Sequence, residues 1–375
     1  MTHLIKNLNN RRIIFLPLAA IVILFVYCGL NSSGYSNGDW PTGSPQSQGL
    51  DRAMLSILDS RIEAGDYGEV HSLLVIRNGC LVFERYYRGY DSERRHRLYS
   101  VTKSFTSALV GIAHEQGVID RLDRIIFDFF PEYDFYENMS GGKADITLEN
   151  ILSMQMGTEW NEFNYPFDDS RNSIYRIRQS TDWVKFVLDL PMVEPPGSRF
   201  RYNTGATMVL SGVIRNRTGN QTVEFADEHL LEPLGIDDYE WESGAQNLTN
   251  TGWGLWMRPR DMARFGQMFL DGGRWDGVQV VPAGWVELST SDHVRVNDQF
   301  HYGYQWWLMS LENTMGHSPS PDDVKICWGY GGQFIFVIPE LRMVVVSTAG
   351  NYGGYSGEEA VDFVPEYVVR AVRGR

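Results

Sequence analysis

Residues 95–117, RHRLYSVTKSFTSALVGIAHEQG, are the most informative stretch of this chain. They place a serine and a lysine together at the start of one predicted helix. Apolar residues recur at helical spacing through this stretch and Gly117 ends the pattern, so the sequence predicts a helix that begins near Ser100. On that helix Ser100 and Lys103 are three positions apart and share a face. The amine of Lys103 is therefore within reach of the Ser100 hydroxyl.

This pair has the composition of a catalytic dyad. A serine hydroxyl is a weak nucleophile until a base removes its proton, and a buried lysine whose pKa has fallen can be that base. The helix N-terminus adds a partial positive charge and free N–H groups beside the Ser100 backbone. The alternative is a helix cap, because Ser-x-x-Lys fixes only two positions and a serine at a helix start commonly caps it.

The composition excludes some classes of protein. A hydrophobic content of 43% in 375 residues supports a substantial core. The 33 basic and 47 acidic residues give a net charge of −14, which argues against binding nucleic acid. Three cysteines are too few for a disulfide framework, and Cys80 and Cys327 form at most one bridge. The histidines show no metal-binding spacing, so we expect no metal and no cofactor.

The N-terminus has the pattern of a targeting segment. Basic residues precede an apolar run at 13–30 that is just long enough to span a bilayer, and no basic residue follows soon after. Residues 1–30 are therefore predicted to be an uncleaved signal anchor, with a cleaved signal peptide as the alternative. Residues 31–48 are rich in Gly, Ser, Asn and Pro and are expected to form a flexible tether. The catalytic domain, residues 49–375, would then lie outside the cytoplasm, in the periplasm, anchored to the membrane or released from it.

Predicted strands lie at both ends of this domain, and a largely helical region at about 120–234 lies between them. This order predicts an α+β fold, in which an antiparallel β-sheet is flanked by helices and carries an inserted all-helical lobe. The segments that define it are a helix at 52–64, a hairpin at 73–87 that turns at Asn78-Gly79, strands at 333–338 and 342–347, and a last helix within 360–372.

Three local interpretations accompany this outline. Residues 157–180 are polar and aromatic without clean periodicity, so we expect a surface loop that borders a cleft. Asp261 is expected to cap the helix that follows it. Residues 34–38, GYSNG, match the G-x-S-x-G nucleophile elbow, but no strand or helix flanks them and we reject them as a site.

Two further elements have the residue types that acyl transfer needs. Tyr202 stands between a Pro-Gly turn and a predicted helix, where a nearby lysine ammonium would make its phenolate accessible for proton relay. The glycine-rich entry to the strand at 333–338 leaves room for another backbone or a ligand. Backbone N–H groups there and at Ser100 could hold the oxyanion of a tetrahedral intermediate. Taken separately, an anchoring tyrosine and a plain glycine-rich turn are the favoured interpretations of the two elements.

The order of these elements is also that of a known family. The chain resembles the serine β-lactamase-related hydrolases, in the branch of class C β-lactamases, carboxylesterases and 6-aminohexanoate-dimer hydrolases, through YSVTKSFTSALVGIA at 99–113, PPGSRFRYNTG at 195–205 and GYGGQFIFVIPE at 329–340. The resemblance implies that Ser100 is the acylated nucleophile, Lys103 its activating base and Tyr202 the proton relay to the leaving group. The oxyanion hole would use the N–H groups of Ser100 and Tyr330.

The departures from the family pattern concern the substrate. Where β-lactamases have Tyr-x-Asn, this chain has Tyr-Asn-Thr at 202–204, so the side-chain amide is missing. Where they have Lys-Thr-Gly, it has Cys-Trp-Gly at 327–329, and an aromatic ring cannot replace a charged donor. Thr204, Trp328 and Gly329 are therefore the candidate substrate-binding residues, and we expect an ester or unactivated amide rather than a β-lactam.

The sequence thus predicts an extracytoplasmic serine hydrolase that cleaves a small ester or amide through an acyl-enzyme on Ser100. A β-lactamase or a D-amino-acid-specific peptidase is the alternative among enzymes. The alternative of another class is a penicillin-type sensor or binding module that is acylated once, or that binds without chemistry. The presence of all three polar catalytic residues argues against this last alternative.

Overall fold

The structure is a computed structural model that describes residues 40–311, 320, 323–352 and 357–373. None of the helices within these residues is long and apolar enough to cross a membrane. The predicted signal anchor and the rejected G-x-S-x-G match lie outside the described residues, as does the first half of the predicted tether.

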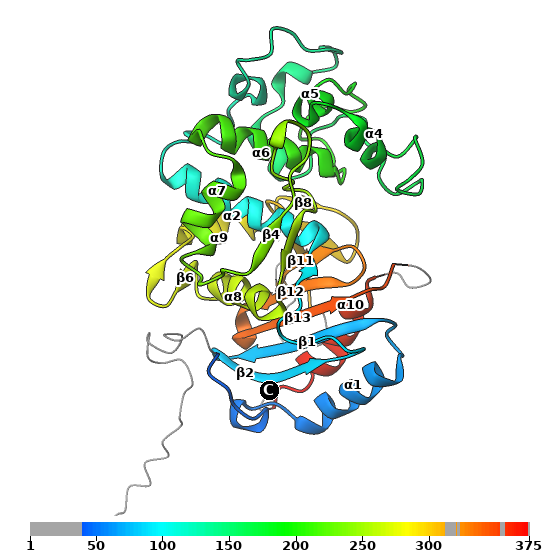
Figure 1. Ribbon diagram of the computed structural model, residues 1–375, viewed down its shortest axis with the longest axis vertical. Helices are drawn as coiled ribbons and strands as arrows, with labels where there is room; N and C mark the ends of the chain where they lie inside the picture. Colours follow the sequence, from blue (N-terminus) through cyan, green and yellow to red (C-terminus); the bar gives the residue numbers. More distant parts are fainter. Residues whose placement is uncertain (1–39, 312–319, 321–322, 353–356, 374–375) are drawn as a thin grey trace, which may run out of the picture.

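One antiparallel sheet of eight strands extends from the lower part of the molecule in Figure 1, where β2 and β1 lie, to its middle, where β11 and β8 lie. Its first hairpin is the predicted one, and Asn78 and Gly79 have the positive φ angles, 52° and 75°, that a two-residue hairpin loop requires. The two strands predicted near the C-terminus are also confirmed. In spatial order the strands are β2 (Cys80–Tyr86), β1 (Val70–Arg77), β13 (Met343–Ala349), β12 (Gln333–Ile338), β11 (Val324–Gly329), β10 (Trp307–Met309), β9 (Phe300–Tyr302) and β8 (Val294–Arg295).

The two faces of the sheet are covered by different helices, because side chains alternate between the faces along each strand. In β13, Val344 and Val346 belong to the core that includes α2 and α8, whereas Val345 belongs to the core that includes α1 and the C-terminal helices. The predicted helix at 52–64 is confirmed. The covering helices are α1 (Arg52–Ala64), α2 (Thr102–Glu115), α8 (Pro259–Leu270), α10 (Glu359–Phe363) and the π-helix η8 (Val364–Val369).

A helical lobe lies above the sheet in Figure 1. Its long central helix, α6 (Thr204–Thr218), packs against α2 and starts two residues after Tyr202. The side chain of the intervening Asn203 caps this helix by accepting a hydrogen bond from the Ala206 N–H at 3.0 Å. The sheet, its covering helices and this lobe confirm the α+β prediction. The other helices of the lobe are α3 (Leu148–Leu152), α4 (Ser173–Gln179), α5 (Trp183–Leu188), α7 (Thr222–Ala226) and the π-helix η5 (Asp227–Leu231).

The segment at 157–180 is more ordered than predicted. It contains α4, and the buried side chain of Asn172 donates hydrogen bonds to the carbonyl oxygens of Glu162 and Tyr165 at 3.0 and 2.8 Å. The same side chain caps α4 by accepting from the Ile174 N–H at 2.8 Å. The prediction of a loop is wrong for the part that forms α4, where the buried Asn172 bonds the backbone and leaves no apolar period to detect. The prediction that the segment borders a cleft is confirmed, because Glu162 and Phe167 line the cavity beside Ser100.

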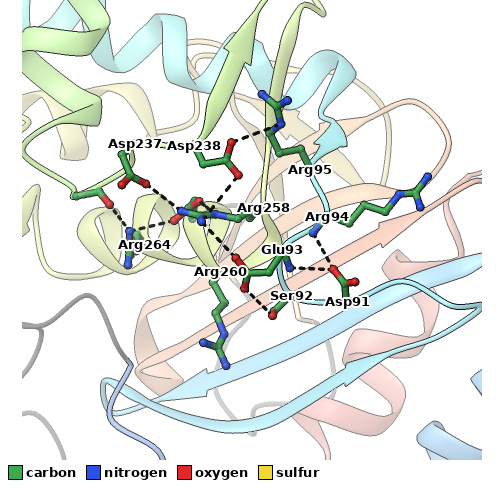
Figure 2. A network of polar contacts seen from close by, with 12 residues as sticks. Asp91, Ser92, Glu93, Arg94, Arg95, Asp237, Asp238, Arg258, Arg260 and Arg264 are labelled. Carbon is green, nitrogen blue, oxygen red and sulfur yellow. Dashed lines mark hydrogen bonds and ion pairs between the residues drawn. The ribbon is translucent and has the colours of Figure 1, made fainter.

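A three-stranded sheet, in the order β3 (His96–Arg97), β5 (Leu255–Met257) and β4 (Tyr239–Trp241), includes the strand that directly precedes the Ser100 turn. Arg258, which follows β5 directly, forms ion pairs with Glu93 at 3.5 Å, Asp237 at 3.3 Å and Asp238 at 3.8 Å (Figure 2). These contacts hold the segment just before Ser100 against the start of α8. The other strands and the other α-helix of the described residues are β6 (Arg274–Trp275), β7 (Val278–Gln279) and α9 (Ala283–Ser289).

Asp261 is not the N-cap of α8. The helix begins two residues earlier, at Pro259, a residue type whose fixed φ suits the first helical position. Asp261 lies inside the first turn with a side chain that is 1% exposed, and it forms ion pairs with Arg258 at 2.7 Å and Arg264 at 3.0 Å. The prediction failed because an aspartate at a helix start serves as a cap or as the partner of a buried arginine, and sequence alone does not distinguish the two.

Candidate active site

Ser100 lies in a tight turn that becomes a helix. Residues Tyr99–Val101 form one 3₁₀ turn (η2), and α2 continues from Thr102, so Ser100 stands at the N-terminal end of the helix, as predicted. Tyr99 has a left-handed backbone with φ of 47°, which is uncommon for an aromatic residue. Its ring packs against those of Tyr330 and Tyr352, at centroid distances of 5.5 and 5.7 Å, and these contacts hold the turn in place.

Lys103 is aimed at the Ser100 hydroxyl. Its Nζ donates a hydrogen bond to Ser100 Oγ at 2.8 Å and another to the carbonyl oxygen of Gly252 at 2.8 Å. The side chain is 1% exposed, and this burial lowers the pKa of Lys103 from 10.5 to about 7, although the negative charge of Glu162 opposes the shift. Near neutral pH a large fraction of Lys103 is therefore an uncharged amine that can accept a proton.

Tyr202 completes the polar group around Ser100. Its hydroxyl lies beside the Ser100 side chain, and the Lys103 Nζ lies 5.0 Å from the centre of its ring. Burial, and then the charge of Glu162, raise the pKa of Tyr202 well above its ordinary value. The expectation of an accessible phenolate is therefore wrong, because the ammonium faces the ring and burial favours the neutral phenol. Tyr202 therefore lies beside Ser100 as a neutral phenol.

The end of β11 comes close to the turn that carries Ser100. A Cβ atom on Gly329 would lie 2.2 Å from the carbonyl oxygen of Leu98, so only glycine fits at this position. Tyr330 follows directly and lines the same cavity as Ser100. The structure thus brings the two residues of the predicted oxyanion hole to one place, and the hydrogen bonds that they would make to an oxyanion stay a prediction.

A cavity of about 230 Å³ opens beside Ser100. Phe167 and Tyr330, which are 37% and 41% exposed, meet edge to face across it with ring centroids 5.4 Å apart. A larger depression of about 850 Å³ lies between α1 and the C-terminal helices, away from the dyad. The lining residues of the smaller cavity are Arg97, Tyr99, Ser100, Glu162, Phe167, Ile174, Arg178, Thr204, Trp253 and Tyr330.

Comparison with known proteins identifies the family. The beta-lactamase family model matches residues 63–360, most of the chain. The chain belongs to the beta-lactamase family. It is 27% identical over 300 residues to the 6-aminohexanoate-dimer hydrolase of Paenarthrobacter ureafaciens, and the match covers 73% of this chain and 71% of that protein. The predicted resemblance is therefore confirmed, and the chain is a serine hydrolase of this family.

Solved structures of the beta-lactamase family share the fold. A family VIII carboxylesterase superposes with a TM-score of 0.65 at 16% identity, over 85% of this chain and 96% of that one. A penicillin binding protein from Bacillus halodurans superposes with a TM-score of 0.63 at 16% identity, over 82% of this chain and 99% of that one. At these identities the similarity concerns the architecture alone.

The three candidate substrate-binding residues lie in different surroundings. Thr204 lines the cavity, but its hydroxyl donates a hydrogen bond to Glu162 at 2.6 Å. Trp328 points to the opposite face of β11, where its ring lies 5.2 Å from that of Trp307. Gly329 serves as the point of close contact described above. Cys327, the neighbour of Trp328, carries a buried free thiol, so it forms no bridge with Cys80.

Sequence reasoning missed Glu162. This glutamate is 8% exposed and lies on the wall of the cavity, although its segment was expected to be a surface loop. The only sequence signal is an acidic residue two positions after Trp160 in a segment that borders a cleft, and this pattern is too common to single it out. Arg97, Phe167, Ile174 and Trp253 also line the cavity without a distinctive motif.

No group of histidine, cysteine, aspartate or glutamate side chains within the described residues has the arrangement of a metal site.

Proposed function

We propose that this chain hydrolyses a small ester or amide through an acyl-enzyme formed on Ser100. The observation that carries the proposal is the hydrogen bond of 2.8 Å between Lys103 Nζ and Ser100 Oγ, made by a buried lysine whose pKa lies near 7. A base is most effective when its pKa is close to the working pH. Lys103 meets that condition and already contacts the atom that it must deprotonate.

Acylation follows from this geometry. Neutral Lys103 takes the Ser100 proton as Oγ forms a bond to the substrate carbonyl carbon, and the carbonyl oxygen becomes an oxyanion. The backbone N–H groups of Ser100 and Tyr330 would donate to that oxyanion. The ammonium of Lys103 then returns its proton, through the Tyr202 hydroxyl, to the departing oxygen or nitrogen as the carbonyl double bond re-forms. The alcohol or amine leaves, and the acyl group remains on Ser100.

Deacylation repeats these steps with water in place of the serine. Water gives a proton, through the Tyr202 hydroxyl, to the neutral Lys103 amine as its oxygen bonds to the acyl carbon. The bond from that carbon to Ser100 Oγ then breaks, and the Lys103 ammonium returns the proton to Oγ. The enzyme returns to its starting state with the carboxylic acid released. A protein that lacked this second half would stay acylated, which is the behaviour of a sensor.

The cavity wall supports an ester or unactivated amide over a β-lactam. Thr204 supplies no side-chain amide, and its hydroxyl is already bound to Glu162. Trp328 provides no cation for a β-lactam carboxylate and packs away from the cavity. Phe167, Ile174 and Tyr330 instead offer apolar surface of a size that suits a short acyl or alcohol chain.

A fluorophosphonate probe and a substrate panel test this proposal together. The probe should label wild-type protein at Ser100, and Ser100→Ala should abolish labelling and the turnover of short acyl esters and linear amides. Nitrocefin should be turned over far more slowly than the best ester. Labelling that survives in Ser100→Ala would move the nucleophile elsewhere, and a stable acyl adduct without turnover would make the protein a sensor.

We also propose that the catalytic domain lies outside the cytoplasm, tethered through residues 1–30. The support is the sequence pattern of basic residues followed by an apolar run of membrane-spanning length. Alkaline phosphatase fused after residue 48 folds actively only when it is exported, so it should be active and should sediment with membranes. An inactive fusion that stays in the cytoplasm would refute the proposed location.

A further inference from the structure

Exposed aromatic rings gather around the dyad. Within the described residues the exposed aromatic side chains are Phe135, Phe163, Phe167, Tyr330 and Tyr352. Phe163 packs against Tyr202, with ring centroids 5.6 Å apart. Phe167 and Tyr352 both pack against Tyr330, at 5.4 Å. Isolated exposed apolar residues are ordinary, but rings that gather at one place mark a binding surface.

Phe163 is the most exposed of these rings, at 70%. The tyrosine against which it packs is also flanked by Trp307 and Phe200, whose ring centroids lie 5.8 and 6.4 Å away and whose side chains are half-buried. These two rings hold Tyr202 in place, so most of the Phe163 ring surface remains available to a ligand. Covering an aromatic ring that is exposed to water with an apolar group is favourable.

Tyr202 indicates which half of a substrate meets Phe163. In the proposed mechanism its hydroxyl carries the proton to the leaving group, so the leaving half lies next to Tyr202 and within reach of Phe163. Among the described residues that line the cavity of about 230 Å³, neither Tyr202 nor Phe163 is present. The cavity therefore remains for the acyl half, which its volume limits to a small group.

A lipid bilayer and another protein are the other occupants that an exposed aromatic surface suits. The net charge of −14 disfavours contact with an anionic membrane surface. The rings lie against Tyr202 and Tyr330, two residues of the proposed acyl-transfer site, and not on a remote face of the molecule. Both observations favour the substrate itself as the occupant.

We infer that Phe163 is a specificity-determining residue that binds an aromatic group in the leaving half of the substrate. This inference rests on the proposed function and adds a substrate class to it, namely esters or amides that join a small acyl group to an alcohol or amine bearing an aromatic ring. A ring packed on Phe163 leaves water and gains the contacts of an aromatic pair. It also holds the departing oxygen or nitrogen near the Tyr202 hydroxyl, its proton donor in the proposed mechanism.

Three esters test the inference: ethyl acetate as the reference, 2-phenylethyl acetate with a ring in the leaving half, and ethyl 3-phenylpropanoate with a ring in the acyl half. Wild-type kcat/KM should be at least about fivefold higher for 2-phenylethyl acetate than for ethyl acetate. Phe163→Ser should bring this ratio close to one, and Phe163→Tyr, which keeps a ring, should retain it. The matched control Phe135→Ser changes an exposed phenylalanine that lies beside Lys185 instead, and it should leave the ratio as in wild type.

Three results would overturn the inference. The first is a wild-type protein without the preference for 2-phenylethyl acetate. The second is a preference that survives in Phe163→Ser, which would leave the surface to a bilayer or another protein. The third is a loss in Phe163→Ser that affects only ethyl 3-phenylpropanoate, which would place Phe163 on the acyl side.

The proposed function is read separately, from turnover of ethyl acetate and its loss in Ser100→Ala. A measurement on wild-type protein alone covers the case in which Phe163→Ser does not fold. The free alcohol 2-phenylethanol should inhibit turnover of ethyl acetate at least about fivefold more strongly than ethanol, and equal inhibition would contradict the inference.

Discussion

Two segments of this chain have the spacing Ser-x-x-Lys, and only one of them forms a dyad. Lys103 and Lys143 are both buried, at 1% and 0% exposure, and each donates a hydrogen bond to a backbone carbonyl, that of Gly252 at 2.8 Å and that of Glu137 at 2.7 Å. Burial lowers both pKa values, to about 7 for Lys103 and about 8 for Lys143. By burial and pKa alone the two lysines are nearly equivalent.

The backbone between serine and lysine makes the difference. Residues 100–103 lead into a helix, which brings the two side chains together at 2.8 Å. The second pair is separated by Gly141 and Gly142, whose φ angles of 66° and 82° form a left-handed turn, and Ser140 is exposed while its lysine points inward. A lowered pKa therefore makes a base only where the backbone also places a hydroxyl and a cavity beside the amine.

The largest effect should come from Lys103→Met. This change keeps an unbranched chain of similar size in the buried site but removes the base, so kcat/KM for a neutral ester should fall by about 10³-fold, within the range for general-base catalysis. Circular dichroism and thermal melting should show that the fold persists, since an apolar chain suits this site. Wild-type activity in a folded Lys103→Met protein would show that Lys103 is not the base.

A smaller loss, about 10²-fold, should follow Tyr202→Phe, which removes the hydroxyl that we propose as the proton relay to the leaving group. The loss should depend on the substrate: it should be slight for p-nitrophenyl esters, whose leaving group needs no proton, and full for alkyl esters and amides. Measuring kcat/KM across such a series checks this. An equal loss for every leaving group would assign Tyr202 to another step.

The smallest effect on activity should come from Lys143→Met, the matched control. Its kcat/KM should stay within about twofold of wild type, because Lys143 contacts no group of the active site. Its free energy of unfolding should change by only about 1 kcal/mol, reflecting the lost hydrogen bond to the Glu137 carbonyl. A severe loss of activity in a stably folded Lys143→Met protein would remove the distinction between the two segments.

Local spacing was enough to predict much of the fold and the dyad. Ser100 and Lys103 are close because helix geometry alone brings positions three apart together, and the hairpin at Asn78-Gly79 follows from the turn that these two residues adopt. Tyr202 could be placed because it stands next to a helix start. Each of these predictions depends on a few neighbouring residues.

Glu162 could not be predicted in this way, because its role depends on tertiary contacts. The loop that carries it is shaped by Asn172, and its carboxylate meets the start of α6, 42 positions along the chain. Asp261 was misplaced for a related reason, since Arg258 and Arg264 draw it into an ion pair that no local pattern announces. Residues that act through such contacts become visible only in the folded molecule.

The pH dependence of kcat/KM tests the central claim, that Lys103 is a neutral base poised next to Ser100. Since only the uncharged amine accepts the Ser100 proton, kcat/KM for an ester without charged groups should rise with pH and level off above an apparent pKa of about 7. Lys143→Met should show the same profile. A rate that keeps rising toward the ordinary lysine pKa of 10.5, or one that does not change with pH around 7, would contradict the account.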